Sequence, residues 1–240
     1  MLTMLPKSAV RKESFDESLS EPKTLVESAY RSLRRDIIEG RLPPGEKLRI
    51  EHIKDNYGVG AGTMREALSL LISDALVNSQ GQRGFRVAPV SLEDFADITD
   101  IRVMLECEAL RQSMARGDDA WEGELIAAFH RLSKAEEKLG DNEHREEWEE
   151  RNRVFHEVLI AACPSHWIKH FLAILYHQTE RYRRLSLQQK AVPRDIHAEH
   201  EALFKAALAR DANLACEILA QHIRFTFQSI RLLPSEALNH

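Results

Sequence analysis

Two glycine-rich segments close together constrain the fold of this chain most strongly. In residues 59–68 (VGAGTMREAL) two glycines precede an amphipathic run, and in residues 81–87 (GQRGFRV) two glycines and two arginines interrupt alternating apolar residues. The first pattern predicts a turn followed by a helix, because glycine adopts turn conformations at little steric cost. The second is typical of a β-hairpin with a basic tip. Together with a preceding short helix, they predict a winged helix-turn-helix.

The segment before these glycines completes the same unit. Apolar residues at helical spacing begin near Thr24, and this helix is expected to stop at Gly40 because the following RLPPG cannot continue it. We expect short helices over about 50–57 and 61–76, with a left-handed turn at Gly58, and a hairpin over 77–90. These elements define a domain over residues 21–90. Residues 1–20 lack periodicity and are expected to form a mobile tail.

From Ser91 onward the pattern is helical almost throughout. Ser91 with Asp94 resembles a helix N-cap followed by an acidic first turn. Breaks in the pattern fall at 117–119, 140–142, 163–165, 192–193 and 211–212. They leave about six helices, enough for an antiparallel bundle over residues 91–233. The predicted fold class is therefore mainly α: an N-terminal winged helix-turn-helix and a C-terminal all-helical antiparallel bundle.

Composition limits where the chain acts and what it meets. No apolar run approaches the ~20 residues of a membrane span, and the N-terminus lacks a signal-peptide core, so we expect a cytoplasmic protein with no membrane partner. Its three cysteines are scattered, which favours core residues in a reducing compartment. The net charge of −5 divides unevenly: residues 1–90 carry 14 Lys and Arg against 12 Asp and Glu, or +2, leaving −7 for residues 91–240. Only the first part is suited to meeting DNA.

A winged helix-turn-helix places the start of its second short helix in a DNA major groove. Thr63 and Arg65 lie in the first turns of that helix, and an arginine fork suits the O6 and N7 acceptors of guanine. Arg83, at the hairpin tip, is a candidate for a phosphate or minor-groove contact. The alternative for Arg65 is a capping or pairing role within the helical unit. These residues predict a double-stranded DNA partner.

Two longer segments carry a resemblance to a known family. Residues 31–48 (RSLRRDIIEGRLPPGEKL) and the MREAL run at 64–68 resemble GntR-type transcription regulators, and the helical body resembles the FCD effector domain of the FadR branch in its shorter, VanR-like form. The resemblance implies a ligand-responsive repressor that binds a palindromic operator as a homodimer. It also implies that Arg65 contacts DNA and that Gly84 lets the wing approach. Ala61 stands where many relatives carry arginine, so the family's operator sequence is not carried over.

Histidines in the body form a candidate metal site. Asn152 and His156 share one helix face, while His200 and His222 flank apolar positions of later helices. A lone helical histidine is more often surface or core filler, but three converging in a bundle can hold a divalent metal. Metal-binding members of the family present Asp-x-x-x-His on one helix and a histidine on each of two later ones. The resemblance thus implies His156, His200 and His222 as ligands, with Asn152 in place of the aspartate.

Imidazole donors favour zinc or nickel over magnesium, and a neutral Asn152 should weaken the site or make it depend on an anionic ligand. The competing interpretation is a polar pocket whose histidines bind the effector directly. A metal-dependent hydrolase using the three histidines, the alternative function, lacks a recognisable acid or base partner. A purely architectural DNA-binding role would need a more basic surface. The chain is therefore predicted not to be an enzyme.

One arginine of the body is a candidate effector contact. By resemblance, Arg102 matches an arginine that points into the pocket of carboxylate-binding relatives, and a bidentate clamp on a carboxylate suits its guanidinium. The alternative is a surface ion pair with Asp97 or Glu106. The arginines at 181, 183 and 184 could supply a second anion contact, but the helical phase is ambiguous there. A further likeness, to glutarate-responsive repressors of this branch, lies in residues 47–49, 58–60, 83–88 and 115–122. It implies that the effector is a small, glutarate-like dicarboxylate.

Overall fold

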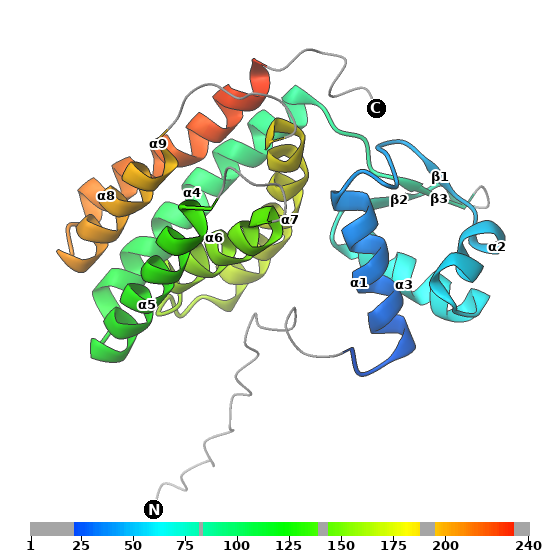
Figure 1. Ribbon diagram of the computed structural model, residues 1–240, viewed down its shortest axis with the longest axis horizontal. Coiled ribbons are helices and arrows are strands. Elements are labelled where there is room, and N and C mark those ends of the chain that lie inside the picture. The colour runs from blue at the N-terminus through cyan, green and yellow to red at the C-terminus, as the bar shows by residue number, and fades with distance from the viewer. Residues whose placement is uncertain (1–21, 82–83, 139–143, 188–194, 233–240) are drawn as a thin grey trace, which may run out of the picture.

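The computed structural model describes residues 22–81, 84–138, 144–187 and 195–232, and over them shows a small part with three short strands beside a part built of helices (Figure 1). The first part comprises α1 (Leu25–Ile38), β1 (Lys47–Leu48), α2 (Ile50–Ile53), the 3-10 helix η2 (Lys54–Tyr57), α3 (Ala61–Ser73), β2 (Val77–Ser79) and β3 (Phe85–Val87). The second comprises α4 (Leu92–Arg116), α5 (Asp119–Glu136), α6 (Arg145–Leu159), α7 (His166–Leu187), α8 (Ile196–Leu208) and α9 (Ala212–Arg231). We call these parts the head and the body. The predicted mainly α fold is confirmed, whereas the predicted tail at 1–20 lies outside the described residues.

The head folds around the packing of α1 against α3. Thr24 caps α1 by accepting a hydrogen bond from the backbone N–H of Glu27, and the helix buries Leu33 and Ile37. Helix α3 contributes Leu68 and Leu71 to the same apolar cluster. The predicted turn between the two short helices is also present. Gly58 ends η2 at φ 64°, a left-handed conformation that glycine adopts without steric cost.

The strands form an antiparallel sheet in the order β1-β3-β2. Leu48 lies opposite Phe85, and Val77 lies opposite Val87. The hairpin of β2 and β3 was predicted from sequence, but β1 was not. A strand of two residues is too short to show the alternation by which strands are recognised.

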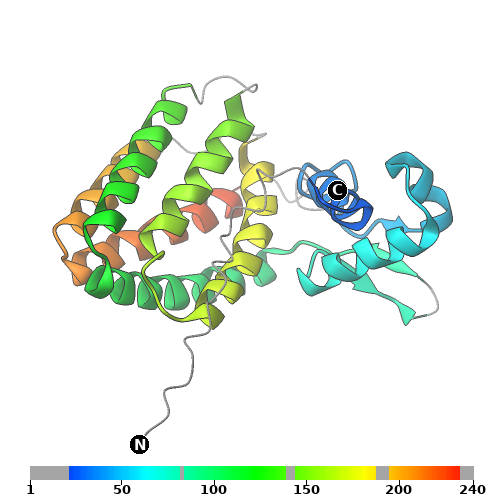
Figure 2. The same cartoon turned by 90° about the horizontal axis from the view of Figure 1, so that it is seen from below.

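Aspartate and serine caps set the boundaries of the body helices. Ser91, Asp118, Asp195 and Asp211 each accept a hydrogen bond from a backbone N–H in the first turn of α4, α5, α8 and α9. Helix α4 packs against α7 and α9, while α5 packs against α6 and α8 (Figure 2). The shared core contains large side chains from several helices, including Leu110, Leu125 and Phe155. Helix ends fall at or near the breaks predicted at 117–119, 163–165 and 211–212, whereas those predicted at 140–142 and 192–193 lie outside the described residues.

Helix α7 is the body helix that faces the head (Figures 1 and 2). Gln178 donates from Nε2 to the backbone carbonyl of Asp74 at 2.7 Å, and Arg181 donates from Nη2 to the carbonyl of Ala88 at 2.8 Å. Asp74 follows α3 and Ala88 follows β3, so a displacement of α7 would move the ends of these two elements of the head.

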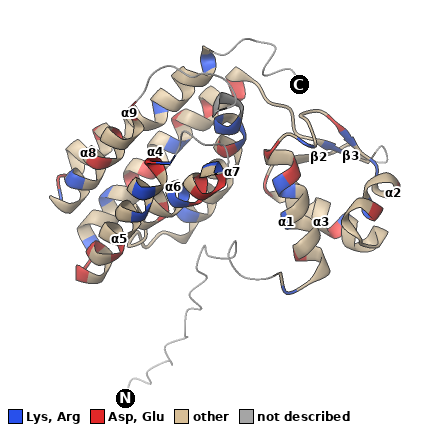
Figure 3. Ribbon diagram, viewed as in Figure 1, with Lys and Arg blue, Asp and Glu red and all other residues tan. Residues whose placement is uncertain are grey.

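Acidic and basic residues are interspersed along the helices of both parts (Figure 3). Charge alone therefore does not distinguish the surface that would face DNA. None of the described helices combines the length and apolarity that a membrane crossing requires.

Candidate DNA interface and histidine site

The start of α3 and the wing border one hollow of the head. This hollow, of about 530 Å³, is lined by Arg65, Gly81 and Gly84 together with Arg49 and His52 from the start of α2. Arg65 is exposed, and within the described part of the chain its guanidinium has no hydrogen bond or ion pair. The capping or pairing alternative for Arg65 thus finds no support among the described residues. Arg49 and His52 were missed, because nothing in their spacing shows that α2 and the wing converge.

The other DNA-binding candidates do not all lie at this hollow. Thr63 is half-buried in the first turn of α3 and is not one of the lining residues of that hollow. Gly84 adopts φ 92°, where other L-residues are strained, and this lets the wing turn beside β1. Arg83 lies outside the described residues. The structure therefore brings Arg65 and Gly84 together.

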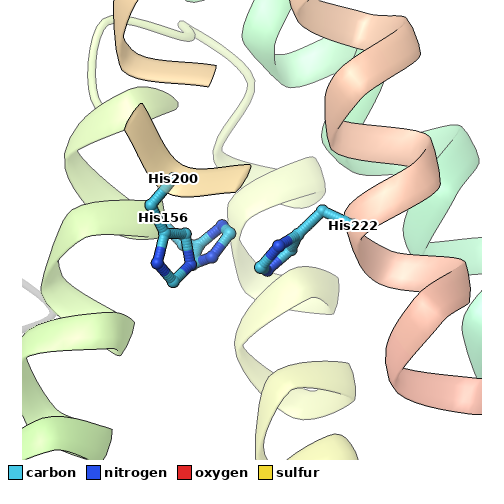
Figure 4. A group of neighbouring side chains, drawn as sticks. All are labelled: His156, His200 and His222. Carbon is cyan, nitrogen blue, oxygen red and sulfur yellow. The ribbon is translucent and has the colours of Figure 1, made fainter. Parts of the chain in front are cut away.

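Three histidines from three helices converge in the body. His156 on α6, His200 on α8 and His222 on α9 present ligand nitrogens that all lie within 4.8 Å of one another (Figure 4). The three side chains are buried, and His200 is 0 % exposed. The predicted candidates are therefore brought together at a spacing that a single ion can bridge.

Two carboxylates orient these imidazoles from behind. Glu136 on α5 bonds Nδ1 of His200 at 2.6 Å, and Glu199 bonds Nδ1 of His222 at 2.8 Å. Such a contact fixes the ring and leaves Nε2 for a ligand, as in carboxylate–histidine–metal arrangements. Nε2 of His200 and Nδ1 of His156 are buried without a hydrogen-bond partner among the described residues. Buried polar atoms are rarely left unpaired, so these two nitrogens fit a ligand that completes the site.

Burial also favours the neutral form of the His156 imidazole. Burial lowers the pKa of His156 well below its ordinary value, and His222 and His200 act in the same direction. The positive charges of Arg102 and Arg183 lower this pKa further. A neutral imidazole keeps the lone pair with which it coordinates a metal.

Asn152 links α6, the helix that carries His156, to a tyrosine of α7. It is buried one turn before His156 and donates from Nδ2 to the hydroxyl of Tyr176 at 2.9 Å. The guanidinium carbon of Arg183 lies 4.7 Å from the centre of the Tyr176 ring, and that of Arg102 lies 5.7 Å from it. Tyr176 therefore contacts Asn152, beside the candidate metal site, and also contacts two arginines.

Both arginines are held by buried carboxylates. Arg102 is 4 % exposed and donates from Nε to Glu106 at 2.7 Å. The predicted alternative, a pair with Glu106, is thus present but buried instead of on the surface. Arg183 donates from Nη2 to Glu149 at 2.8 Å. This settles the helical phase that the sequence left ambiguous.

Comparisons with known proteins agree with this architecture. The model of the bacterial regulatory proteins of the gntR family matches residues 25–87, and the FCD domain model matches residues 97–225. The chain is 47 % identical to the uncharacterized HTH-type transcriptional regulator BphR of Paraburkholderia xenovorans, over 89 % of this chain and 88 % of the relative. It is 37 % identical to the HTH-type transcriptional repressor GlaR of Escherichia coli, over 81 % and 90 %.

A solved structure shares the fold. The E. coli protein McbR/YncC superposes with a TM-score of 0.71 at 21 % identity, over 87 % of this chain and 97 % of that one. Since the matching families and relatives are transcription regulators, the hydrolase alternative is set aside. This chain belongs to the GntR family of bacterial regulatory proteins, carries an FCD domain, and is a ligand-responsive DNA-binding transcription regulator, not an enzyme.

Proposed function

We propose that this regulator holds a divalent metal and a small dicarboxylate in its body, and that their binding changes the affinity of a homodimer for its operator. The observation that carries this proposal is the cluster of three buried histidines whose nitrogens lie within 4.8 Å of one another, oriented by Glu136 and Glu199. Under the proposed division, residues 21–90 read DNA and residues 91–233 bind the effector.

The donor set supports zinc or nickel. His156, His200 and His222 supply imidazole nitrogens, which these metals prefer over the oxygen-seeking magnesium. Asn152, one turn before His156, is the candidate fourth donor. All four donors are neutral, and the carboxylates of Glu136 and Glu199 lie behind the imidazoles instead of on the ion. Since a buried charge is stabilised by a directly bound partner of opposite charge, an anion is expected to complete the site.

A carboxylate effector meets that requirement. One carboxylate would lie against the metal, and a second would reach a guanidinium, for which Arg102 is our first candidate. Arg183 is the second candidate, since both arginines contact the ring of Tyr176. The likeness to glutarate-responsive repressors, and the 37 % identity to GlaR, support glutarate as the first compound to test. The metal supplies charge for binding the effector, and no reaction is involved.

The head would read DNA through Thr63, Arg65, Arg83 and Gly84. The exposed guanidinium of Arg65 supports a base contact, and the wing glycines support a close approach to the backbone. Two heads related by a two-fold axis would bind a palindromic operator. A cytoplasmic location is part of this proposal, because a bacterial regulator meets its operator there.

Calorimetric titration of the metal-free protein tests this proposal. We expect one zinc per chain, and glutarate binding that appears only after zinc has been added. In the variant His156→Ala zinc binding should be lost, whereas His170→Ala, which removes an exposed histidine of α7, should bind as the wild type does. Equal zinc affinity in the two variants would exclude His156 as a ligand, and tight glutarate binding without zinc would favour direct recognition by the histidines.

A further inference from the structure

Two cysteines face one another across the longest helix contact of the body. Helices α4 and α9 run antiparallel side by side, with Cys107 on the first and Cys216 on the second (Figure 1). Sγ of Cys107 lies 3.5 Å from the carbonyl oxygen of Cys216, and Sγ of Cys216 lies 3.4 Å from the carbonyl oxygen of Cys107. The two contacts are reciprocal, so each sulfur reaches the backbone of the opposite helix.

This reciprocal approach places the two cysteine side chains against one another where α4 packs on α9. Disulfide formation needs the two backbones to be close and the side chains to point toward one another, and both conditions are met here. Cys163 differs, because its buried thiol contacts the amide oxygen of Gln112 at 3.6 Å and no second cysteine.

The surroundings favour a thiolate at one of the two sulfurs. The neighbouring thiol of Cys107 lowers the pKa of Cys216 below its ordinary value, and the positive charge of Arg111 acts in the same direction, against the effect of burial. The pKa of Cys107 is raised by the same neighbour and by burial. Both cysteines belong to the apolar core and are 7 % and 5 % exposed, so oxidation of the pair requires a small oxidant. A thiolate is the nucleophile in thiol oxidation.

We propose that Cys107 and Cys216 form a dithiol that hydrogen peroxide converts into an intramolecular disulfide joining α4 to α9. The Cys216 thiolate attacks one peroxide oxygen, the O–O bond breaks, and protonation of the leaving hydroxide gives water and a sulfenic acid. The Cys107 sulfur then attacks the sulfenic sulfur and loses its proton. The S–S bond forms, and the sulfenic hydroxyl leaves as a second water. Both sulfurs are oxidised by one electron each, and one peroxide is reduced.

The cross-link would fix two helices that frame the histidine site. Cys107 follows Glu106, the partner of Arg102, and Cys216 precedes His222 on the same helix. This consequence rests on the proposed function, because it requires the site to bind a metal. We expect the oxidised protein to bind zinc with an affinity changed by at least about threefold, and dithiothreitol to restore the original value.

Peptide mapping of the full-length protein tests the cross-link directly. Metal-free protein is treated with excess hydrogen peroxide, remaining thiols are alkylated, and the digest is run without reductant. We expect a linked peptide pair containing Cys107 and Cys216, with Cys163 alkylated. The variants Cys107→Ser and Cys216→Ser should lose the linked pair, and the matched control Cys163→Ser should keep it. Melting curves confirm that each variant is folded before oxidation.

Other outcomes overturn the proposal. Recovery of Cys107 and Cys216 as alkylated thiols, as sulfinic acids, or in disulfides with Cys163 or another chain would exclude the dithiol. If the linked pair forms and zinc affinity stays unchanged, the cross-link does not regulate the histidine site. If the reduced protein binds no zinc, the metal proposal fails while the mapped disulfide stands.

Discussion

At the scale of single residues, the proposed metal site depends on the carboxylates that orient the histidines as much as on the histidines themselves. Glu136 and Glu199 hold Nδ1 of His200 and His222, so each ring turns its other nitrogen toward the shared centre. These carboxylates are expected to raise the basicity of the ligands and to fix their orientation. Loss of one should weaken metal binding without removing a ligand.

The variant Glu199→Gln should bind zinc about 10–100-fold more weakly than the wild type, because the amide no longer carries the charge that orients His222. Glu201→Gln is the matched control, since this neighbour pairs with Lys205 on the same helix. Competition with a zinc chelator measures both affinities. Equal affinities for the two variants would show that Glu199 does not support a metal ligand.

By its resemblance to the family, this chain has Asn152 where the metal-binding members carry aspartate. In the variant Asn152→Asp, a carboxylate would face the metal, and the Tyr176 hydroxyl could donate to it in place of the present hydrogen bond. We expect zinc affinity to rise by about tenfold, because a negative donor attracts the dication. The same chelator competition measures this, and unchanged or weaker binding would place Asn152 outside the coordination sphere.

Arg65 is the proposed DNA contact with the clearest geometry. Its replacement by alanine should cost about 1–3 kcal/mol in operator binding, which is the discrimination carried by a bidentate base contact. Arg116→Ala, an exposed arginine at the end of α4, is the control for lost charge alone. Fluorescence anisotropy with operator and random duplexes distinguishes the two. Equal losses on both duplexes would mean that Arg65 contacts phosphate only.

The sequence placed His156 on one helix face with Asn152 and set His200 and His222 beside apolar positions. The likeness to the family then selected these three histidines from among the others. The sequence did not predict Tyr176, and it left Arg183 as one of three candidates for a second anion contact. Two tyrosines and three arginines in one helix leave its inward face ambiguous, and only the packing of α7 against α4 and α6 resolves it. Partners such as Glu136 and Glu149 lie on other helices, so no local pattern points to them.

At the scale of elements, α7 connects the two proposed sites. Its residues Tyr176 and Arg183 face the histidine site, while Gln178 and Arg181 bond the head. A helix that contacts both places can couple them if ligand binding displaces it. Sequence periodicity predicted this helix and its start after residues 163–165, but could not show that one of its faces contacts the head.

The variant Gln178→Ala should weaken the coupling and leave the site intact. Losing the hydrogen bond to Asp74 removes about 0.5–1.5 kcal/mol, so we expect the effect of glutarate on operator affinity to fall by about 2–10-fold. Zinc affinity should not change. Gln112→Ala is the control, because Gln112 bonds Glu108 within α4. An unaltered glutarate effect would exclude this contact from the coupling path.

At the scale of the whole molecule, a small DNA-reading head is joined to a helical sensor whose proposed ligands lie deep in the bundle (Figure 1). The change in hydrophobic periodicity near Ser91 predicted the division of the chain into these two parts. The relation between the parts could not be predicted, since the contacts of α7 with the head connect residues far apart in the chain. An effector that binds both conformations equally would leave operator affinity unchanged.

The central claim is that a carboxylate bound at the histidine site controls the head. The most direct test is an anisotropy titration of zinc-loaded protein on duplex DNA from upstream of its own gene, or on a duplex selected from a random pool, with and without saturating glutarate. We predict that glutarate changes the operator dissociation constant by about 5–150-fold, the usual range of allosteric coupling. The change should disappear in His156→Ala. An unchanged dissociation constant in the wild type, or an equal change in His156→Ala, would contradict the account.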